Sequence, residues 1–495
     1  MSVDRMVESN RKLTAWLIIL AVLAVHLALA SGVPLGVDEA HYALYALNPD
    51  LSYFDHPPMV GWLQLLIAPL GYNELTVRLI PALLYALSSV LVLRLGRTLF
   101  NDESGRTGLV AVFLLNTAPI LQLMGWGLVP DLPLMVVALL AVDVTWRIYQ
   151  HNRLVDWLLL GVLYGFAGLS KYTALFIPIG LVGFLFQHQG MRWLRQPGPW
   201  LAAVIAFVLI SPVLIWNVQN DWVSFAYQLD RGMEVSVWSL KDALGMQVGQ
   251  MLLYSLLAYV VGIAVLISVL RNRFPQEHKA AAWLIIWTTW PGLLVVAYSA
   301  GGDAVLPNWP AMMWSVLAPL SAYWICLNWQ KLWVKILTLV SSVLSVGIIA
   351  FVFAFLAFMP LSTFPFMKGA IKDLVGWKQA AVHARQLLEE VRQETGSDEP
   401  VLLVDNWVRA SRIAWYAYPL PVQVITDRLS QFDFWYGEPD ADSRGILIRD
   451  NRSVPEDGRY EKAGIVCQLR DVLNTGVDGV EVNRFQFYYC DPQLK

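Results

Sequence analysis

Apolar runs long enough to cross a lipid bilayer recur along most of this chain, and the first extends from Leu13 to Ala30. A run of about 18 or more apolar residues is typical of a membrane-spanning helix. Hydrophobic residues make up 57% of the 495 residues and charged residues only 15%, which is too little charge for a soluble domain of this size. The chain is therefore predicted to be a polytopic α-helical membrane protein.

The apolar runs predict about eleven spans. They lie at residues 14–31, 77–97, 107–125, 130–147, 155–169, 172–187, 199–216, 247–270, 281–300, 309–326 and 333–358. The fifth and sixth are short, so they could be tilted or partly re-entrant. The first resembles a secretory signal because Arg11 and Lys12 precede it, but we expect it to be retained as a membrane anchor.

Basic residues are unequally divided between the two sides of this topology. With the N-terminus in the cytoplasm, the cytoplasmic side holds fifteen lysines and arginines, and the outer side before residue 360 holds only four: Arg78, Lys171, Arg231 and Lys241. Cytoplasmic loops are normally rich in Lys and Arg, so this bias sets the orientation. Carboxylates gather on the outer side, mostly in long loops at 32–76 and 217–246, where function tends to reside.

The composition changes after Pro360, and this predicts two domains: a transmembrane domain at 1–359 and a soluble α/β domain at 360–495. A helix is expected over 378–395, and strands over 401–404, 422–426, 445–448 and 464–467. Cys467 and Cys490 both fall in this outer domain, where a disulfide and two buried thiols are equally compatible with the sequence.

Asp38 and Glu39 follow the first span and are the first candidates for chemistry. Adjacent residues of a helix point about 100° apart, so the two acids would not share one target. One could act as a general base while the other orients a partner. A solvated or helix-capping pair is an equally good explanation, since acids favour the start of a helix.

The segment Tyr53 to Pro58 is a more specific signal, because it holds Asp55 and His56 on an aromatic and proline-rich stem. Asp55 and His56 together could bind a divalent metal ion, and a protonated His56 could bind a phosphate. The alternative is an interfacial aromatic anchor with ordinary polar neighbours.

Further candidates lie on the same outer side. Asp131 opens a span and could cap it or face the same pocket as Asp38, while Lys171 suits an anionic headgroup or could snorkel to the interface. The loop from Trp216 to Arg231 mixes amides, acids and aromatics, which commonly hold sugars, although interfacial anchoring explains it equally well. A rigid turn follows at Leu306 to Pro310.

These residues, in this order, resemble the GT-C superfamily of membrane glycosyltransferases, and in particular bacterial family-39-like enzymes and aminoarabinose transferases. The resemblance covers most of residues 30–315 and includes Asp38–Glu39, the Tyr53–Pro58 motif, Asp131, Lys171–Tyr172, Asp221–Trp222 and Leu306–Pro310. The stretch Ser430 to Trp435 also resembles the outer domain of bacterial members.

The resemblance implies a sugar donor carried on a polyprenyl phosphate and an inverting transfer at the periplasmic face of the bacterial inner membrane. It implies catalytic roles for Asp38, Glu39 and Asp131. Contacts to the phosphate or sugar of the donor are implied for Tyr53, Asp55, His56, Lys171, Tyr172, Asp221, Arg231 and Asn308. Charge on the leaving phosphate needs a cation or metal, for which His56, Lys171, Arg231 and Lys241 are candidates.

One departure from the resemblance matters for the phosphate. Aminoarabinose transferases carry Glu-Lys where this chain has Asp55-His56, so a permanent cation is replaced by a titratable one. Metal binding by Asp55 and His56 becomes more plausible, and phosphate contact there becomes doubtful or pH-dependent.

The sequence therefore predicts a glycosyltransferase acting on lipid A, another envelope glycan or a protein, with the bilayer but no nucleic acid as a further partner. A secondary transporter is a weaker alternative, because the acids cluster at one rim instead of the midplane. A non-catalytic envelope scaffold is the other alternative.

Overall fold

The computed structural model describes residues 3–233, 237–302, 305–395, 400–426, 428–453, 455 and 457–494. The chain divides into two compact units. The helical unit comprises Met1–Ala30, Leu51–Leu63 and Leu75–Val352, and the sheet unit comprises Ser31–Asp50, Gln64–Glu74 and Phe353–Lys495. The predicted outer loop at 32–76 is thus shared between the two units, and most of it belongs with the C-terminal residues.

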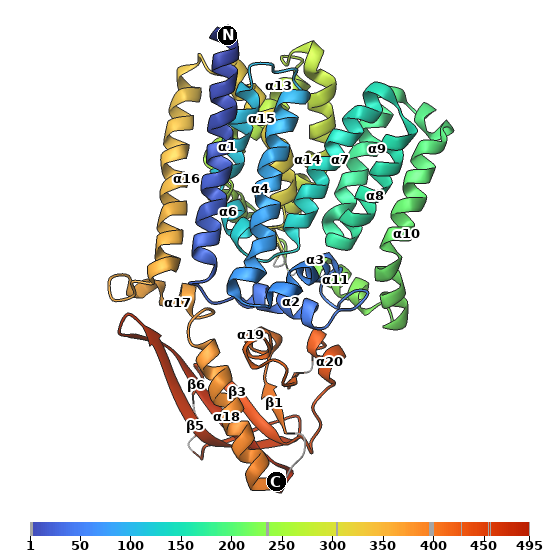
Figure 1. The fold of residues 1–495 in the computed structure, drawn as a ribbon. Coiled ribbons are helices and arrows are strands. Elements are labelled where there is room, and N and C mark those ends of the chain that lie inside the picture. The colour runs from blue at the N-terminus through green and yellow to red at the C-terminus, as the bar shows by residue number, and fades with distance from the viewer. Residues whose placement is uncertain are drawn as a thin grey trace. The chain divides into compact units, whose positions relative to one another are not determined.

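Long helices make up the helical unit (Figure 1). They are α1 (Val3–Ala30), α4 (Glu74–Thr98), α5 (Arg106–Asn116), α6 (Pro119–Trp126), α7 (Asp131–His151), α8 (Leu154–Ser170), α9 (Phe176–Gln189), α10 (Pro197–Gln219), α11 (Val223–Met233), α12 (Leu240–Leu253), α13 (Leu256–Leu270), α14 (Lys279–Ser299), α15 (Ala311–Asn328) and α16 (Leu332–Phe358). A short helix, α3 (Met59–Gln64), follows the Tyr53–Pro58 segment.

The chain is a multi-span membrane protein, but the predicted count of eleven spans is not confirmed. Among the described residues, seven helices are long and apolar enough to cross a membrane, or up to nine if two bent pairs each form one span. In these pairs α5 meets α6 at 75° and α12 meets α13 at 112°. The two remaining predicted spans correspond to α8 and α9, which have only 17 and 14 residues. Pro119 at the start of α6 explains the first bend, because proline has no N–H to continue the helix before it.

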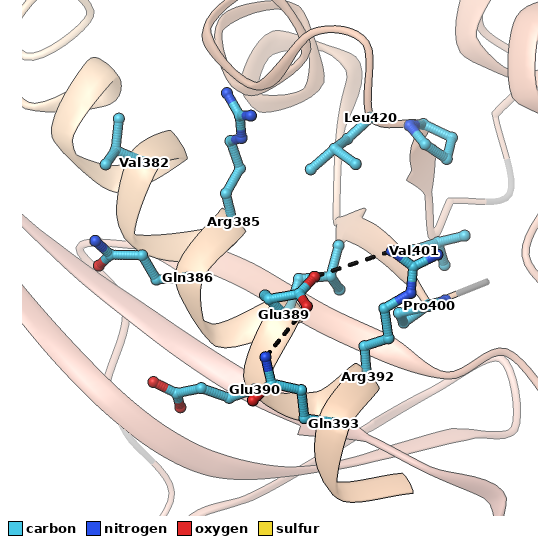
Figure 2. A pocket seen from close by; sticks show the side chains of 12 residues that line it. Val382, Arg385, Gln386, Glu389, Glu390, Arg392, Gln393, Pro400, Val401 and Leu420 are labelled. Carbon is cyan, nitrogen blue, oxygen red and sulfur yellow. Dashed lines mark hydrogen bonds and ion pairs between the residues drawn. The ribbon is translucent and has the colours of Figure 1, made fainter. Parts of the chain in front are cut away.

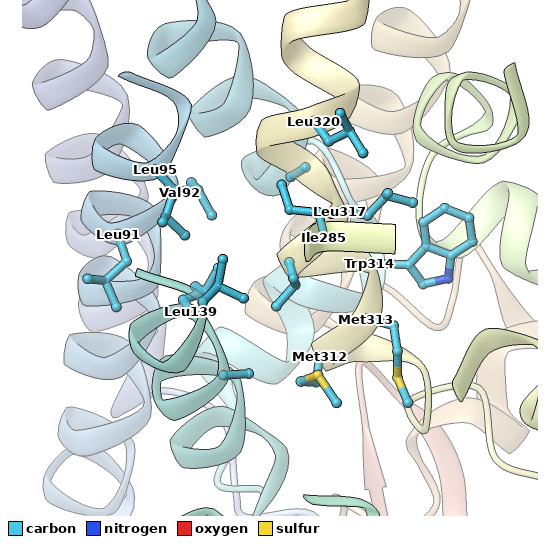
Figure 3. Packing of buried hydrophobic residues seen from close by; sticks show 14 of the residues in the cluster. Leu91, Val92, Leu95, Leu139, Ile285, Met312, Met313, Trp314, Leu317 and Leu320 are labelled. Carbon is cyan, nitrogen blue, oxygen red and sulfur yellow. The ribbon is translucent and has the colours of Figure 1, made fainter. Parts of the chain in front are cut away.

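Large apolar side chains from α4, α7, α14 and α15 interdigitate in the core of the helical unit (Figure 3). Where α8 meets α10, small residues replace them. A Cβ added at Gly161 of α8 would lie 2.7 Å from the backbone oxygen of Ala202 in α10. The two backbones approach this closely only because glycine has no side chain, which is a common device of helix packing in membranes.

The sheet unit contains a six-stranded mixed sheet in the order β2-β1-β3-β6-β5-β4. Its strands are β1 (Val401–Val404), β2 (Val422–Val424), β3 (Gly445–Asp450), β4 (Arg459–Lys462), β5 (Ile465–Val477) and β6 (Val480–Cys490). The first three are parallel to one another, and the other pairings are antiparallel. The sheet unit also contains the helices α18 (Trp377–Thr395), α19 (Trp407–Ala417) and α20 (Gln431–Tyr436). The predicted C-terminal α/β fold is confirmed.

Each face of the sheet carries its own apolar cluster. Leu402 and Val404 of β1 point to the face covered by α18 and α19, while Leu403 points to the opposite face, as the alternation of a strand requires. On that opposite face Cys467 and Cys490 lie opposite each other in β5 and β6 and form a disulfide, which settles the alternative left open by the sequence.

Helix α2 (Val37–Leu47), which carries Asp38 and Glu39, belongs to the sheet unit. Leu44 of α2 is fully buried in the cluster formed by α18, α19 and the first face of the sheet. Helix α2 therefore packs against residues of the C-terminal part of the chain, although it lies within the range predicted as the transmembrane domain.

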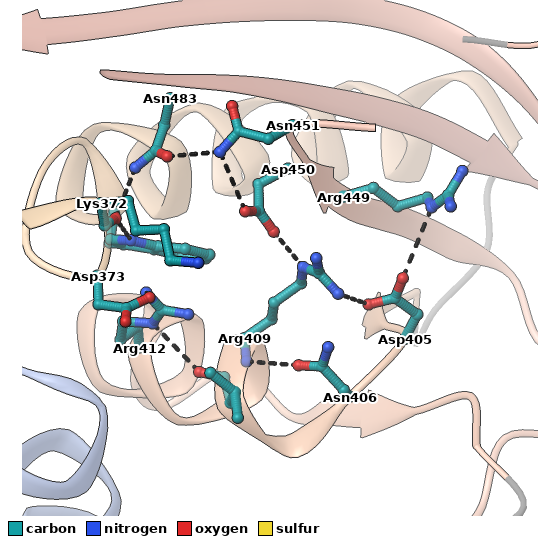
Figure 4. A network of polar contacts seen from close by, with 12 residues as sticks. Lys372, Asp373, Asp405, Asn406, Arg409, Arg412, Arg449, Asp450, Asn451 and Asn483 are labelled. Carbon is teal, nitrogen blue, oxygen red and sulfur yellow. Dashed lines mark hydrogen bonds and ion pairs between the residues drawn. The ribbon is translucent and has the colours of Figure 1, made fainter. Parts of the chain in front are cut away.

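Charged side chains fill the carboxyl ends of β1 and β3 (Figure 4). Arg409 of α19 pairs with both Asp405 and Asp450, and Arg449 Nε lies 3.6 Å from Asp405 Oδ2. Arg412 lies 2.8 Å from Asp373 and 3.4 Å from the ring centre of Trp377, and burial lowers the pKa of its guanidinium to about 10 against the opposing effect of Asp373. In parallel sheets this edge is where ligands usually bind, but here arginines of the chain itself occupy it.

Replacing Asp450 by alanine should destabilise the sheet unit by about 3 kcal/mol, because Arg409 would keep its buried charge and lose one of two partners. Thermal unfolding of the full chain in detergent measures the effect. Glu394→Ala is the matched control: it removes an exposed partner of Arg470, and such surface pairs contribute at most about 1 kcal/mol. Equal losses in the two variants would show that burial of the network does not matter.

Candidate active site

A buried ion pair joins three segments of the helical unit. Lys171 Nζ lies 2.6 Å from Asp131 Oδ1, and Asn308 Nδ2 donates to Asp131 Oδ2 at 3.1 Å. The side chains of Lys171 and Asp131 are only 7% and 5% exposed. Both oxygens of the carboxylate therefore have partners, and the sequence-based interpretations of Asp131 as a simple cap and Lys171 as a snorkelling cation do not describe this contact.

The two residues of this pair lie at opposite kinds of helix end. Asp131 is the first residue of α7, where the partial positive charge of a helix N-terminus favours an anion. Lys171 directly follows α8, where the partial negative charge of a C-terminus favours a cation. Burial of two charges is costly, so a good geometry and extra hydrogen bonds are needed to offset it. Tyr254, which the sequence did not single out, donates to Pro307 O at 2.8 Å and so holds the turn that presents Asn308.

The Tyr53–Pro58 segment contacts α11, which lies in the other long loop. Gln228 Nε2 donates to Asp55 O at 2.6 Å, and the rings of Phe54 and Tyr227 lie 4.7 Å apart. Tyr53 is fully buried, whereas Asp55 and His56 are half-buried. The first loop motif and the second loop, which the sequence treated as separate signals, are therefore neighbours within the helical unit.

Tyr172 connects this neighbourhood to the ion pair. Its hydroxyl lies 2.6 Å from Ser224 Oγ at the start of α11, the helix whose Gln228 contacts Asp55. Because Tyr172 directly follows Lys171, the groups at 53–58, 131, 171–172, 224–228 and 308 form one continuous set of contacts. The colours of Figure 1 show that α7, α8, α11 and α15, which carry or adjoin these groups, come from different parts of the sequence.

The turn between α10 and α11 holds another predicted residue. Asp221 and Trp222 are exposed, and both have a positive φ, 52° and 60°. This left-handed conformation is uncommon for residues other than glycine, and the Trp222 N–H holds the turn by donating to Asn217 O at 2.7 Å. The backbone of Arg231 lies in α11, but its side chain is outside the described part of the chain, so its predicted phosphate contact stays a prediction.

The two acids of α2 have different environments within the sheet unit. Asp38 is exposed, whereas Glu39 is buried and its Oε2 accepts a hydrogen bond from the Gly36 N–H at 3.0 Å. Glu39 thus caps the start of its own helix, which was the alternative to a catalytic role in the sequence analysis. The predicted catalytic roles of Asp38 and Glu39 stay predictions.

Metal binding by Asp55 and His56 also stays a prediction. In the described ranges no three side chains of His, Cys, Asp or Glu come together to hold a metal ion. The two residues would suit an ion such as Mg²⁺, which commonly takes one or two protein ligands and completes its shell with water and substrate phosphate.

An apolar cavity of about 570 Å³ lies between α8, α9 and α10. Trp157, Trp193 and Trp200 line it near the start of α8, and Lys171, Tyr172 and Phe225 line it near the other end. The remaining lining is almost wholly aliphatic or aromatic. The cavity is thus apolar along the length of α8, with Lys171 of the buried ion pair among the residues at one end.

The sheet unit has a cavity of about 950 Å³ beside α18 (Figure 2). Charged and amide side chains line it, including Arg385, Glu389 and Arg392, and Arg392 pairs with Glu389 at 3.9 Å. None of the residues predicted as functional from the sequence lines this cavity.

The fold matches that of known glycosyltransferases. ArnT from Cupriavidus metallidurans superimposes in its apo state with a TM-score of 0.62 over 97% of this chain and 98% of that one, at 13% identity. The chain therefore has the same overall fold as ArnT. The same score holds for ArnT bound to undecaprenyl phosphate, over 95% and 97% of the two chains. An oligosaccharyltransferase from Archaeoglobus fulgidus superimposes with a TM-score of 0.52, at 14% identity, over 81% of this chain and 61% of that one.

Sequence comparisons find similarities over parts of the chain. The dolichyl-phosphate-mannose-protein mannosyltransferase family matches residues 55–216, a range that includes Asp55, Asp131 and Lys171 but not Asp38. The lipid A galacturonosyltransferase RgtD from Rhizobium johnstonii is 24% identical over 311 residues, which cover 60% of this chain and 61% of that enzyme. The chain thus spans about three fifths of the length of this curated relative. These similarities agree with the superfamily that the sequence motifs suggested.

Proposed function

We propose that this protein transfers a sugar from a polyprenyl-phosphate donor to an acceptor hydroxyl at the outer face of the bacterial inner membrane. The observation that carries the proposal is that Lys171 lines one end of the apolar cavity between α8, α9 and α10. Such a donor combines a phosphate with a long apolar chain, and this cavity offers a cation and an apolar lining to one ligand. The fold of an ArnT solved with undecaprenyl phosphate supports the same donor class.

The chemistry requires a base and a cation. Asp38 would take the proton of the acceptor hydroxyl, whose oxygen attacks the anomeric carbon from the side opposite the phosphate. The bond between that carbon and the phosphate oxygen breaks, and polyprenyl phosphate leaves with the electron pair of that bond. The configuration at the anomeric carbon is inverted. Lys171 would stabilise the charge that develops on the leaving phosphate. A divalent ion at Asp55 and His56 would supply the same charge stabilisation when bound.

The acceptor class follows from the relatives and from topology. RgtD is a lipid A galacturonosyltransferase, so a lipid A acceptor and a hexosyl or pentosyl donor are the first choice, ahead of other envelope glycans or proteins. The excess of Lys and Arg in the predicted cytoplasmic loops supports a cytoplasmic N-terminus and a periplasmic sheet unit.

Cells without this gene should lack one sugar residue on a single class of envelope glycolipid. Mass spectrometry of extracted lipid A and other glycolipids, from deleted and complemented cells, measures this directly and identifies sugar and acceptor together. Release of free polyprenyl phosphate by the purified protein, dependent on the acceptor, is the matching test in vitro. Unchanged glycolipid masses together with no release in vitro would favour the transporter or scaffold alternatives.

A further inference from the structure

Helix α2 is attached to the sheet unit by more than apolar packing. His41 of α2 and Ser411 of α19 are both buried, and His41 Nδ1 lies 3.1 Å from Ser411 Oγ. The Ser411 hydroxyl donates its only hydrogen to Trp407 O at 2.8 Å. Ser411 must therefore accept from His41, which requires the proton of the imidazole to be on Nδ1.

Aromatic rings surround the His41 imidazole. Trp407 of α19 and both Phe432 and Trp435 of α20 lie with ring centres 5.4, 6.0 and 6.1 Å from it, and Tyr45 of α2 lies at 5.3 Å. These distances are those of edge-to-face and offset aromatic contacts. Phe432 and Trp435 come from the stretch that resembled the outer domain of bacterial GT-C members, so the sequence signal there corresponds to the surface that holds α2.

A second contact fixes the chain just before α2. The Leu35 N–H donates to Tyr416 Oη at 3.2 Å, and Tyr416 Oη donates to Glu74 Oε1 at 3.3 Å. Tyr416 is the fifth residue after Ser411 in α19. One helix of the sheet unit therefore holds both the entry to α2 and its middle.

This attachment bears directly on Asp38. Asp38 lies three residues before His41, on a neighbouring part of the helix surface, and it is exposed while His41 is buried. If α2 slid by one residue, Asp38 would move by about 1.5 Å along the helix axis and turn by about 100°. A general base must lie within hydrogen-bond reach of its proton, and a misplacement of about 1 Å can cost about 100-fold in rate.

We propose that the sheet unit positions the catalytic base of this protein, with His41 and Ser411 as positioning residues that act through Asp38. The proposal rests on the proposed function, and it gives the C-terminal unit a role in catalysis itself. Substitutions at the contact should lower kcat and leave the KM for the lipid donor unchanged, because neither residue contacts the apolar cavity of the helical unit.

The test compares variants of the full chain in nanodiscs. His41→Phe keeps a ring among the aromatics but removes the hydrogen bond, and we expect kcat to fall about 10-fold or more with the donor KM within about twofold. His41→Asn keeps an N–H near the position of Nδ1 and should recover part of the loss. Ile465→Val is the matched control, because it weakens packing on the opposite face of the same sheet, away from α2. It should lower the melting temperature and leave kcat unchanged.

Hydrogen–deuterium exchange of residues 37–47 supplies a readout that does not depend on activity. Faster exchange there in His41→Phe, together with the loss in kcat, supports positioning. Normal kcat in His41→Phe would overturn the proposal, and so would a loss in kcat without any change in exchange. Absence of transfer by the unsubstituted protein would instead overturn the proposed function, and that assay precedes any comparison of variants.

Discussion

Replacing Asp38 by asparagine should lower kcat by about 10²- to 10⁴-fold and leave the protein folded. Asparagine keeps the shape of the side chain but cannot accept a proton, and general bases typically contribute rate factors of this size. Asp38 is exposed on α2, and asparagine can keep hydrogen bonds that the side chain makes. The KM for the donor should change little, since the base acts on the acceptor. Transfer from polyprenyl-phosphate sugar, measured under saturating donor, gives the result.

The control for this prediction is Asp50→Asn. Asp50 is exposed, lies in the same segment of the sheet unit, and the substitution makes the same change in charge. We expect it to retain activity close to that of the unsubstituted protein. Equal activity in Asp38→Asn and Asp50→Asn would remove Asp38 from the mechanism.

Glu39 needs a different comparison because it caps α2. Glutamine at position 39 can still accept the hydrogen bond from the Gly36 N–H, so Glu39→Gln keeps the cap while removing the charge. A loss as large as that of Asp38→Asn would establish a catalytic carboxylate at position 39, whereas retained transfer would assign Glu39 to the cap alone.

Apolar length was enough to predict a helical membrane protein but not its number of spans. The run at 247–270 is continuously apolar, yet the chain bends by 112° between α12 and α13, with Ser255 at a φ of 80°. Ser255 Oγ lies 2.9 Å from Ser341 Oγ in α16, and Ser341 Oγ also accepts from the Leu257 N–H. A hydropathy pattern does not reveal such a contact between distant segments, so a broken helix and a straight one give the same apolar run in the sequence.

The same limitation applied to the candidate site. Asp131 and Lys171 were each predicted to be functional, but each had a plausible local explanation. Only the structure shows that their side chains form a pair, 2.6 Å apart and separated by 40 residues of sequence. The attachment of α2 was missed because His41 and Ser411 are 370 residues apart. Strand β6 was missed for a local reason: the adjacent polar residues Asn483 and Arg484 interrupt its apolar alternation between Val482 and Phe485.

Replacing Lys171 by methionine should both destabilise the helical unit and abolish donor binding. Asp131 would keep a buried carboxylate with Asn308 as its remaining partner, and breaking a buried ion pair in this way typically costs about 3–5 kcal/mol. The melting temperature in detergent should fall clearly. On its own, this variant cannot separate a structural role of Lys171 from phosphate binding, because an unfolded protein binds no donor.

The double variant Lys171→Met with Asp131→Asn separates the two roles. It removes both charges, and asparagine at 131 can still accept from Asn308, so no buried charge is left without a partner. Stability should return to within about 1 kcal/mol of the unsubstituted protein, because replacing a buried ion pair by neutral groups is often nearly neutral. Binding of polyprenyl phosphate, measured by native mass spectrometry, should stay at least 10-fold weaker. Full recovery of binding along with stability would show that the ammonium group serves the fold and not the phosphate. The cation for the leaving group would then have to come from His56, Arg231, Lys241 or a bound metal ion.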